Sequence, residues 1–403
     1  MNDAIVIVGG GHAAAQLCAA LAEAGQGARV HLVSEETALP YQRPPLSKAY
    51  VKNPQEALQL HRDAAWYATH GITLHLGDAA VGVDRETRIV RLASGRELPY
   101  ARLVLATGTR ARTLPALDHP LENVLTLRNV ADADAMRARL QRAGGGALTV
   151  LGGGFIGLEV AATARGLGWQ VQVLEAAPRL LARAASPELS VQVLQHHLDL
   201  GTQVQLGVAV GHFEQDAQRL QALQVNGVRQ DIDQLLLGIG AVPETTLAHA
   251  AGLDVGNGIL VDASMVTSDP DILAVGDCTS FPYAGERLRL ESVQNANDQA
   301  KVAGATLLGK PAAYQPVPWF WSEQGAMRLQ MVGLWRVGLE AVRRQGAVAG
   351  SFSLFHYEGS ALVAVESVSA PVDHMWARKL LEKGVSPGAQ QVGDPQVALK
   401  TLL

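Results

Sequence analysis

Two glycine-rich segments hold the residue types best suited to bind a nucleotide. Residues 9–14 read GGGHAA and fit the pattern G-x-G-x-x-A, and residues 152–157 read GGGFIG and fit G-x-G-x-x-G. In such turns the first glycine permits a tight bend, the second lets the backbone approach a diphosphate, and the third, small position lets helix and strand pack closely. The diphosphate then lies against the unpaired N–H groups at the start of a helix. Each segment therefore predicts a dinucleotide site.

An acidic residue follows each glycine segment at about the distance expected of a ribose ligand. Glu35, with Glu36 as the alternative, follows the first segment, and Glu175 follows the second. A carboxylate accepts hydrogen bonds from a free ribose 2′-hydroxyl and repels a 2′-phosphate, so Glu175 favours NADH over NADPH. A protein with two dinucleotide sites can reduce one nucleotide with the other, which is flavoprotein chemistry. The pair of sites therefore predicts FAD and NADH as cofactors.

The elements around the two segments repeat each other. An apolar strand at residues 5–8 enters the first glycine turn, an Ala-rich helix follows, and a second strand covers residues 29–33. The same order returns with strands at residues 148–151 and 170–174. Because self-similarity of this kind marks a repeated structural unit, the chain is expected to contain two Rossmann-type α/β domains.

Other patterns divide the rest of the chain. Residues 72–76 and 89–92 alternate between apolar and polar side chains, which predicts strands between the two repeats. From Pro316 onward aromatic residues appear, alternating runs at 351–355 and 362–365 indicate antiparallel strands, and residues 375–383 predict a final helix. The sequence predicts an FAD-binding domain in two segments, 1–112 and 243–318. It also predicts an NAD-binding domain at 113–242 and a C-terminal α+β domain at 319–403.

Bulk composition excludes several classes of protein. The chain has 403 residues, enough for two or three domains, and a formal charge of −5, which argues against a nucleic-acid partner. The apolar run near the N-terminus lacks a basic leader and breaks at a glycine triplet, so it predicts a buried strand and not a secretion signal. No stretch approaches the roughly 18 apolar residues of a membrane span. We therefore expect a cytoplasmic protein with no membrane or nucleic-acid partner.

Cysteine and histidine offer little catalytic chemistry. Cys18 and Cys278 are far apart in sequence and form no C-x-x-C pair, which excludes a local redox disulfide and a cysteine zinc site, and we expect no metal. Both thiols are expected to be buried apolar groups. His196 and His197 have no companion at a metal-ligand spacing, so the sequence predicts a solvated pair on a helix.

Longer motifs make the chain similar to the bacterial FAD-dependent NADH:ferredoxin reductases, members of the two-dinucleotide-binding flavoproteins. The motifs that carry this resemblance are residues 39–48 (LPYQRPPLSK), 103–108 (LVLATG), 236–240 (LLGIG), 267–277 (TSDPDILAVGD), 289–296 (RLESVQNA) and 318–322 (PWFWS). The resemblance covers nearly the whole chain and implies a glutathione-reductase-like fold. It also implies hydride transfer from NADH to FAD and release of single electrons to a 2Fe–2S ferredoxin. Relatives that use a cysteine need it within residues 41–48, where this chain has none.

The resemblance implies roles for individual residues. Lys48 and Glu159 are the expected catalytic pair, with the lysine as a cation near the flavin and the carboxylate holding both the lysine and the nicotinamide carboxamide. The expected FAD contacts are Gly9, Gly11, His12, Ala13, Ala14, Glu35, Arg43, Lys48, Val81, Ala106, Thr107, Gly108, Arg128, Asp277, Val293, Gln294 and Trp321. The expected NAD contacts are Gly152, Gly154, Phe155, Ile156, Gly157, Glu159, Glu175 and Gly240.

The partner is expected to bind a local basic patch. The chain from Trp319 carries one more basic than acidic residue, while the remainder is acidic. By resemblance, Lys301, Arg378 and Lys379 are the expected docking residues. The runs SKAYV (47–51) and ESVSAPVDHM (366–375) favour a ferredoxin that serves a haem-thiolate monooxygenase. The alternatives are electron supply to a ring-hydroxylating dioxygenase, a cysteine-independent NADH oxidase or quinone reductase, and an NADH-sensing flavoprotein.

Overall fold

The computed structural model describes residues 3–117 and 119–403, which form two compact units. Of the described residues, the first unit contains 3–43, 58–110 and 241–316, and the second contains 44–57, 111–117, 119–240 and 317–403. The chain thus enters the second unit three times. The four-segment domain division remains a prediction, and the structure adds that residues 44–57, which contain most of the R-P-P-L-S-K run, pack within the second unit.

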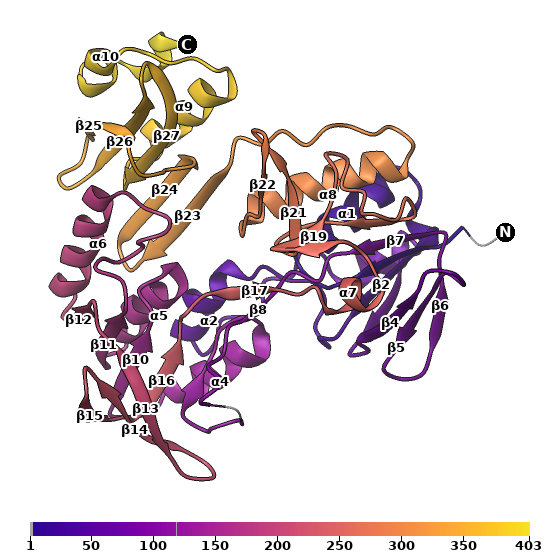
Figure 1. Cartoon of the computed structure of the whole chain (residues 1–403), viewed down its shortest axis with the longest axis horizontal. Helices are drawn as coiled ribbons and strands as arrows, with labels where there is room; N and C mark the ends of the chain where they lie inside the picture. Colours follow the sequence, from indigo (N-terminus) through magenta and orange to yellow (C-terminus); the bar gives the residue numbers. More distant parts are fainter. Residues whose placement is uncertain (1–2, 118) are drawn as a thin grey trace. The chain divides into compact units, whose positions relative to one another are not determined.

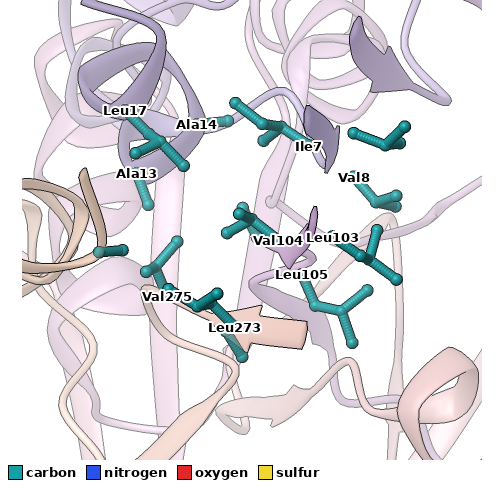
Figure 2. Packing of buried hydrophobic residues seen from close by; sticks show 14 of the residues in the cluster. Ile7, Val8, Ala13, Ala14, Leu17, Leu103, Val104, Leu105, Leu273 and Val275 are labelled. Atoms are coloured by element: carbon teal, nitrogen blue, oxygen red, sulfur yellow. The ribbon is translucent and has the colours of Figure 1, made fainter. Parts of the chain in front are cut away.

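A five-stranded parallel sheet is the centre of the first unit. Its order is β20-β7-β1-β2-β3, from strands Ile272–Ala274, Arg102–Leu105, Ile5–Val8, Val30–Ser34 and Thr73–Leu76. Most residues of these strands are apolar and buried, as is usual for a parallel sheet. Helices α1 (His12–Glu23) and α8 (Val293–Leu307) pack against each other through small residues, where Gly304 meets Ala20. Figure 2 shows Ala13, Ala14 and Leu17 of α1 beside the apolar side chains of the sheet.

Smaller elements complete the first unit. Three antiparallel strands, β4 to β6, are Ala80–Asp84, Ile89–Leu92 and Glu97–Pro99. A second small sheet of order β18-β19-β21-β22 uses Val255–Gly256, Gly258–Leu260, Thr279–Tyr283 and Glu286–Leu288. Strands β8 (Thr109–Ala111) and β17 (Ala241–Pro243) pair with each other where the chain leaves and re-enters this unit. The short helices are η1 (Gly27–Arg29), α3 (Ala64–Thr69) and α7 (Thr246–Ala250).

The second unit repeats the parallel architecture. Its sheet has the order β12-β11-β10-β16-β9, from Gln203–Leu206, Gln170–Glu175, Ala147–Leu151, Gln234–Leu237 and Val124–Leu125. Its helices are α4 (Val130–Leu140), α5 (Phe155–Gly166) and α6 (Pro187–Asp199), and η2 (Pro44–Ser47) and α2 (Ala49–Lys52) pack among them. An antiparallel sheet adds β13 to β15, at Val210–Gln215, Leu220–Val225 and Val228–Asp231. The expected repeat of the Rossmann-type fold is confirmed.

The C-terminal part of the second unit is an antiparallel sheet covered by helices (Figure 1, orange to yellow). Its order is β23-β24-β27-β26-β25, from Trp319–Gln324, Met327–Gly333, Ala361–Val368, Phe352–Glu358 and Glu340–Gln345. The predicted final helix starts earlier, as α9 (Pro371–Glu382), because a proline suits the first helical turn. It also does not end the chain: α10 (Ala389–Gly393) and η3 (Leu399–Leu402) follow and bury Val392 and Leu399 in the same core.

The histidine pair of α6 is not solvated, which corrects the sequence-based expectation. His197 is fully buried and its Nε2 lies 2.9 Å from Oε1 of Gln324 on β23, while Nε2 of His196 lies 2.7 Å from the Gln324 carbonyl oxygen. Both imidazoles therefore attach α6 to the C-terminal sheet. The α6 sequence alone could not reveal this because the partner is 127 residues away. Among the described residues, no helix has the length and apolar composition needed to cross a bilayer.

Burial of His197 predicts a loss of stability in mild acid. Desolvation lowers the pKa of His197 to about 4, from an ordinary value of 6.5. The unfolded chain therefore binds the proton more readily, so the stabilisation is complete above pH 6.5 and is lost as the pH falls towards 4. We expect His197 to contribute up to about 3 kcal/mol to this loss. Urea unfolding between pH 7.5 and 4.5 measures it: His197→Gln should flatten the pH dependence, while the exposed-histidine control His249→Gln should follow the wild type.

Candidate functional site

The two glycine turns have the same backbone geometry. Gly9 and Gly152 have φ of +123° and +106°, and their amide groups donate to the carbonyl oxygens of Val33 and Leu174, each at 2.8 Å. A Cβ atom on Gly9 would lie 2.1 Å from the carbonyl oxygen of Ala106. Neither turn tolerates a side chain at this position. The predicted first-glycine role is therefore met at both turns.

The helices that follow the turns begin with open N-termini. α1 and α5 have Gly11 and Gly154 as N-caps, neither has a side-chain cap, and neither has an acidic residue in its first turn. The first N–H groups of these helices therefore remain available to a diphosphate, and the helix dipole favours its negative charge. A Cβ on Gly157 would lie 2.8 Å from the Gly152 carbonyl oxygen, which explains the small residue at the third position. These features fit a dinucleotide at each turn.

The residues at the ends of the second strands differ. Because Gly9 bonds Val33 and Gly152 bonds Leu174, Ser34 occupies in the first turn the position that Glu175 occupies in the second. Glu35 lies one residue further on and is exposed, whereas Glu36 accepts hydrogen bonds from the Tyr41 hydroxyl at 2.5 Å and from Arg43 at 2.7 Å. Of the two acids weighed for the first site, Glu36 is thus held by protein groups, while Glu35 remains the predicted ribose ligand.

The remaining FAD candidates of the first unit lie on three kinds of element. Ala106, Thr107 and Gly108 follow β7, and the Thr107 hydroxyl donates to the Glu244 carbonyl oxygen at 2.6 Å. His12, the first residue of α1, is nearly buried and packs its ring edge-on to His61 at 4.6 Å. Val81 lies on β4 with 60% of its surface exposed.

The motif at residues 267–277 ends in the turn after β20, and a hydrogen bond joins this turn to α8. Gly276 has a φ of +86°, and its amide donates to Gln299 on α8 at 2.7 Å, which places Asp277 at the turn that follows β20. Val293 and Gln294 are the first two residues of α8, and the Ser292 cap accepts from the third N–H, that of Asn295. The N–H groups of Val293 and Gln294 precede the capped position, and both residues remain predicted flavin contacts.

In the second unit an acid is held beside the glycine turn. The carboxylate of Glu175 accepts a hydrogen bond from the Gly153 amide and another from the Ala177 amide at 2.6 Å. These bonds fix the carboxylate beside the turn before any ribose arrives. Gly240, with a φ of +101°, ends the motif at residues 236–240, and a Cβ there would lie 3.5 Å from a guanidinium nitrogen of Arg183. Arg183 is exposed and lies in none of the sequence motifs.

The predicted catalytic pair is brought together in the second unit. Nζ of Lys48 lies 2.7 Å from Oε2 of Glu159, whose side chain is only 3% exposed. Oε2 also accepts from the Ser47 hydroxyl at 2.5 Å, and Oε1 accepts from the Ser322 hydroxyl at 2.7 Å and the Glu323 amide at 3.3 Å. Ser47 and Ser322 were missed by sequence reasoning. The sequence did offer one indication: Ser47 precedes Lys48 in the motif at 39–48, and Ser322 follows Trp321 in the motif at 318–322.

The other candidates of the second unit are more dispersed. Phe155 begins α5, and its ring centroid lies 4.7 Å from that of Phe320. Ile156 is 47% exposed. Trp321 stacks on Trp319 with ring centroids 5.6 Å apart. Arg128 precedes α4, and its amide donates to Asp132 at 2.7 Å.

Neither cysteine has reactive character. Cys18 and Cys278 are both reduced and fully buried, and burial raises the pKa of each thiol, that of Cys18 to about 12. A thiolate is the reactive form of cysteine, and burial disfavours it. Thiol chemistry therefore has no support at either residue.

Comparisons with known proteins identify the family of the chain. Residues 3–300 match the family described as pyridine nucleotide-disulphide oxidoreductase, and residues 319–403 match the family described as reductase C-terminal. The ferredoxin–NAD(+) reductase component of the anthranilate 1,2-dioxygenase system of Burkholderia cepacia is 41% identical, with 100% of this chain and 99% of that protein covered.

Solved structures give the same result. The ferredoxin reductase for the CYP199A2 system from Rhodopseudomonas palustris superposes with a TM-score of 0.94 at 40% identity, covering 99% of both chains. The covalent putidaredoxin reductase–putidaredoxin complex gives a TM-score of 0.93 at 37% identity, covering 100% of this chain and 98% of that one. The chain therefore belongs to the pyridine nucleotide-disulphide oxidoreductase family and, within it, to the bacterial FAD-dependent NADH:ferredoxin reductases.

Proposed function

We propose that this enzyme oxidises NADH and passes the electrons, through FAD, to a 2Fe–2S ferredoxin that serves an oxygenase. The observation that carries the proposal is the Lys48–Glu159 pair, in which a buried carboxylate on α5, the helix after the second glycine turn, is joined to a lysine of the R-P-P-L-S-K run. A surface ion pair would have no such placement. The open helix N-termini and the acid at Glu175 support the same reading.

Each residue of the pair has a separate task. Bound FAD supplies the hydride-accepting and one-electron chemistry. Lys48 provides a positive charge, which favours negative charge developing on a neighbouring ring, and its orientation is fixed by Glu159 and by the Pro44 carbonyl oxygen at 3.1 Å. Glu159 can also accept a hydrogen bond from the nicotinamide carboxamide. Because the groups are oriented before the substrates arrive, little reorganisation is needed during the reaction.

The acceptor is assigned from the relatives and the sequence. One relative is a component of a dioxygenase system, and two of the similar structures are a ferredoxin reductase for a CYP199A2 system and a putidaredoxin complex. With the runs at 47–51 and 366–375, a haem-thiolate monooxygenase system is the preferred destination of the electrons. Supply to a ring-hydroxylating dioxygenase is the alternative. We place the enzyme in the cytoplasm, where NADH and ferredoxin are available.

The proposed docking residues have local partners. Lys301 is 61% exposed and lies 3.0 Å from Asp298, one turn earlier on α8. On α9 the Arg378 guanidinium carbon lies 4.4 Å from the Trp319 ring centre, and Lys379 lies 4.3 Å from that of Trp376. Arg378 therefore packs as well as carries charge. We propose that Lys301, Arg378 and Lys379 each contribute positive potential to ferredoxin binding.

Steady-state NADH oxidation with a panel of 2Fe–2S ferredoxins tests the acceptor. We expect the purified protein to be yellow and to reduce at least one ferredoxin from the host's oxygenase systems far faster than it reduces oxygen or quinones. If no ferredoxin raises the rate of NADH oxidation above the rate measured with oxygen or quinone, the chain would instead be an NADH oxidase or a quinone reductase.

Glu175 should set the preference for NADH. Replacing it with serine removes the carboxylate that repels a 2′-phosphate, so the ratio of kcat/KM for NADH to that for NADPH should fall by about tenfold, or 1.4 kcal/mol. Glu214→Ser, which removes a half-exposed carboxylate of β13 that is paired with Arg229, is the control and should leave the ratio unchanged. A wild-type enzyme that uses NADPH as efficiently as NADH would show the cofactor assignment to be wrong.

The two cysteines should be dispensable. Because both thiols are buried and disfavour the thiolate, the double variant Cys18→Ala, Cys278→Ala should retain ferredoxin reduction within a few-fold of the wild type, apart from a loss of stability caused by the small cavities. Flavin absorbance confirms that the variant is loaded. Complete loss of turnover in a folded, FAD-loaded variant would contradict this prediction.

Charge reversal at Lys301 should weaken ferredoxin binding alone. Lys301→Glu is expected to raise the KM for ferredoxin several-fold, while anaerobic reduction of the flavin by NADH stays normal. The effect should fade as salt is added, because exposed charges are screened within about 10 Å at 0.1 M ionic strength. Lys310→Glu changes the net charge equally and is the control. If both variants behave alike, or if salt has no influence, Lys301 is not part of the docking surface.

A further inference from the structure

Glu159 has its two carboxylate oxygens held from two different directions. Oε2 receives hydrogen bonds from Lys48 and Ser47, which belong to the segment of residues 44–48. Oε1 receives them from the Ser322 hydroxyl and the Glu323 amide, both on β23. An ionised carboxylate can only accept hydrogen bonds, so every one of these four groups acts as a donor. The lysine explains the Oε2 side, and the Oε1 side has no task in the function described so far.

The position of Ser322 follows from the periodicities of two elements. Phe155, Glu159 and Thr163 are four residues apart along α5 and therefore share one face. Phe320 and Ser322 are two residues apart on β23 and also share a face. These two faces meet: the ring centroids of Phe155 and Phe320 are 4.7 Å apart, and the Ser322 hydroxyl donates to Oε1 of Glu159 at 2.7 Å. On the same face of α5, the Thr163 hydroxyl donates to the Ser47 carbonyl oxygen at 2.8 Å.

A hydroxyl on Oε1 controls what Oε2 can do. A carboxylate rotates easily about its last side-chain bond, because that torsion is broad. Donors on Oε2 alone would let the group turn or tilt with the lysine. The Ser322 hydroxyl, itself completely buried, fixes the second oxygen and so defines the plane of the carboxylate. The direction in which Oε2 holds the Lys48 ammonium group is thereby defined as well.

We infer that Ser322 is a positioning residue for hydride transfer from NADH, acting through Glu159 on Lys48. The inference rests on the proposed function, since it assigns Ser322 to the same reaction. Ser322 need not touch either nucleotide. Its hydroxyl keeps the ion pair in one orientation, and loss of the hydroxyl should slow the transfer while leaving NADH binding through the glycine turn and Glu175 intact.

Anaerobic stopped-flow reduction of the holoenzyme by NADH is the test. Ser322→Ala should lower the limiting rate of flavin reduction by about tenfold and change the apparent dissociation constant for NADH by less than twofold. Ser322→Cys, which nearly preserves the volume but has a weak donor, should be as slow as Ser322→Ala. A cysteine variant as fast as the wild type would show that packing, and not the hydrogen bond, matters, and would overturn the inference.

A matched control separates positioning from stability. Ser353 on β26 of the same sheet is also completely buried, and its hydroxyl bonds that of Ser367 at 2.9 Å, remote in sequence from Glu159 and its four donors. Ser353→Ala should therefore lose stability without slowing flavin reduction. Equal slowing in Ser353→Ala and Ser322→Ala would mean a general structural effect and would overturn the inference. If Ser322→Ala does not retain FAD, the cysteine variant decides the question alone.

A measurement independent of turnover completes the test. The Lys48 side chain is 20% exposed, and its rate of acetylation by acetic anhydride can be followed by mass spectrometry. We expect several-fold faster labelling of Lys48 in Ser322→Ala than in the wild type or Ser353→Ala, and unchanged labelling would overturn the inference. Failure of NADH to reduce the wild-type flavin would reject the proposed function itself, whereas equal rates in wild type and Ser322→Ala reject only the role of Ser322.

Discussion

One buried carboxylate of the second unit joins three segments of the chain. The Glu159 carboxylate lies at the meeting point of three segments that are distant in sequence: the residues around Lys48, helix α5, and strand β23. Burying an isolated carboxylate costs several kcal/mol, so its presence requires partners on every side. Four donors meet this requirement. The same contacts join α5 to the C-terminal sheet, so the carboxylate that we propose to act in the reaction also holds these segments together.

Local sequence patterns predicted the fold well. The glycine turns, the strands at either side of them, and the antiparallel strands near residues 351–365 follow from spacing and alternation, and each has its place in the structure. The association of Lys48 with Glu159 was also anticipated, although through resemblance and not through any local pattern. Their separation of 111 residues leaves no periodicity that could connect them.

The rest could not be predicted because it depends on tertiary contacts. Ser322 and Ser47 are ordinary residues in their own segments, and only the packing of α5 against β23 and η2 gives them a common partner. The burial of His197 has the same cause, since its hydrogen-bond partner is on β23. Likewise, Ser34 and not Glu35 corresponds in position to Glu175. The difference is one residue in where a strand ends, and sequence patterns do not locate strand ends that closely.

Even- and odd-numbered residues of strand β23 have different surroundings. Its even-numbered residues Phe320, Ser322 and Gln324 contact α5 and α6, and its odd-numbered residues Trp319 and Trp321 stack on each other. A shift of the strand by one residue would exchange the two sets and place tryptophans against the buried carboxylate, because side chains alternate between faces. An insertion or deletion just before Trp319 that shifts the strand can therefore be tolerated only if it has an even number of residues. The glycine turns act through their backbone, so they place no such condition on the length of the loops that follow them.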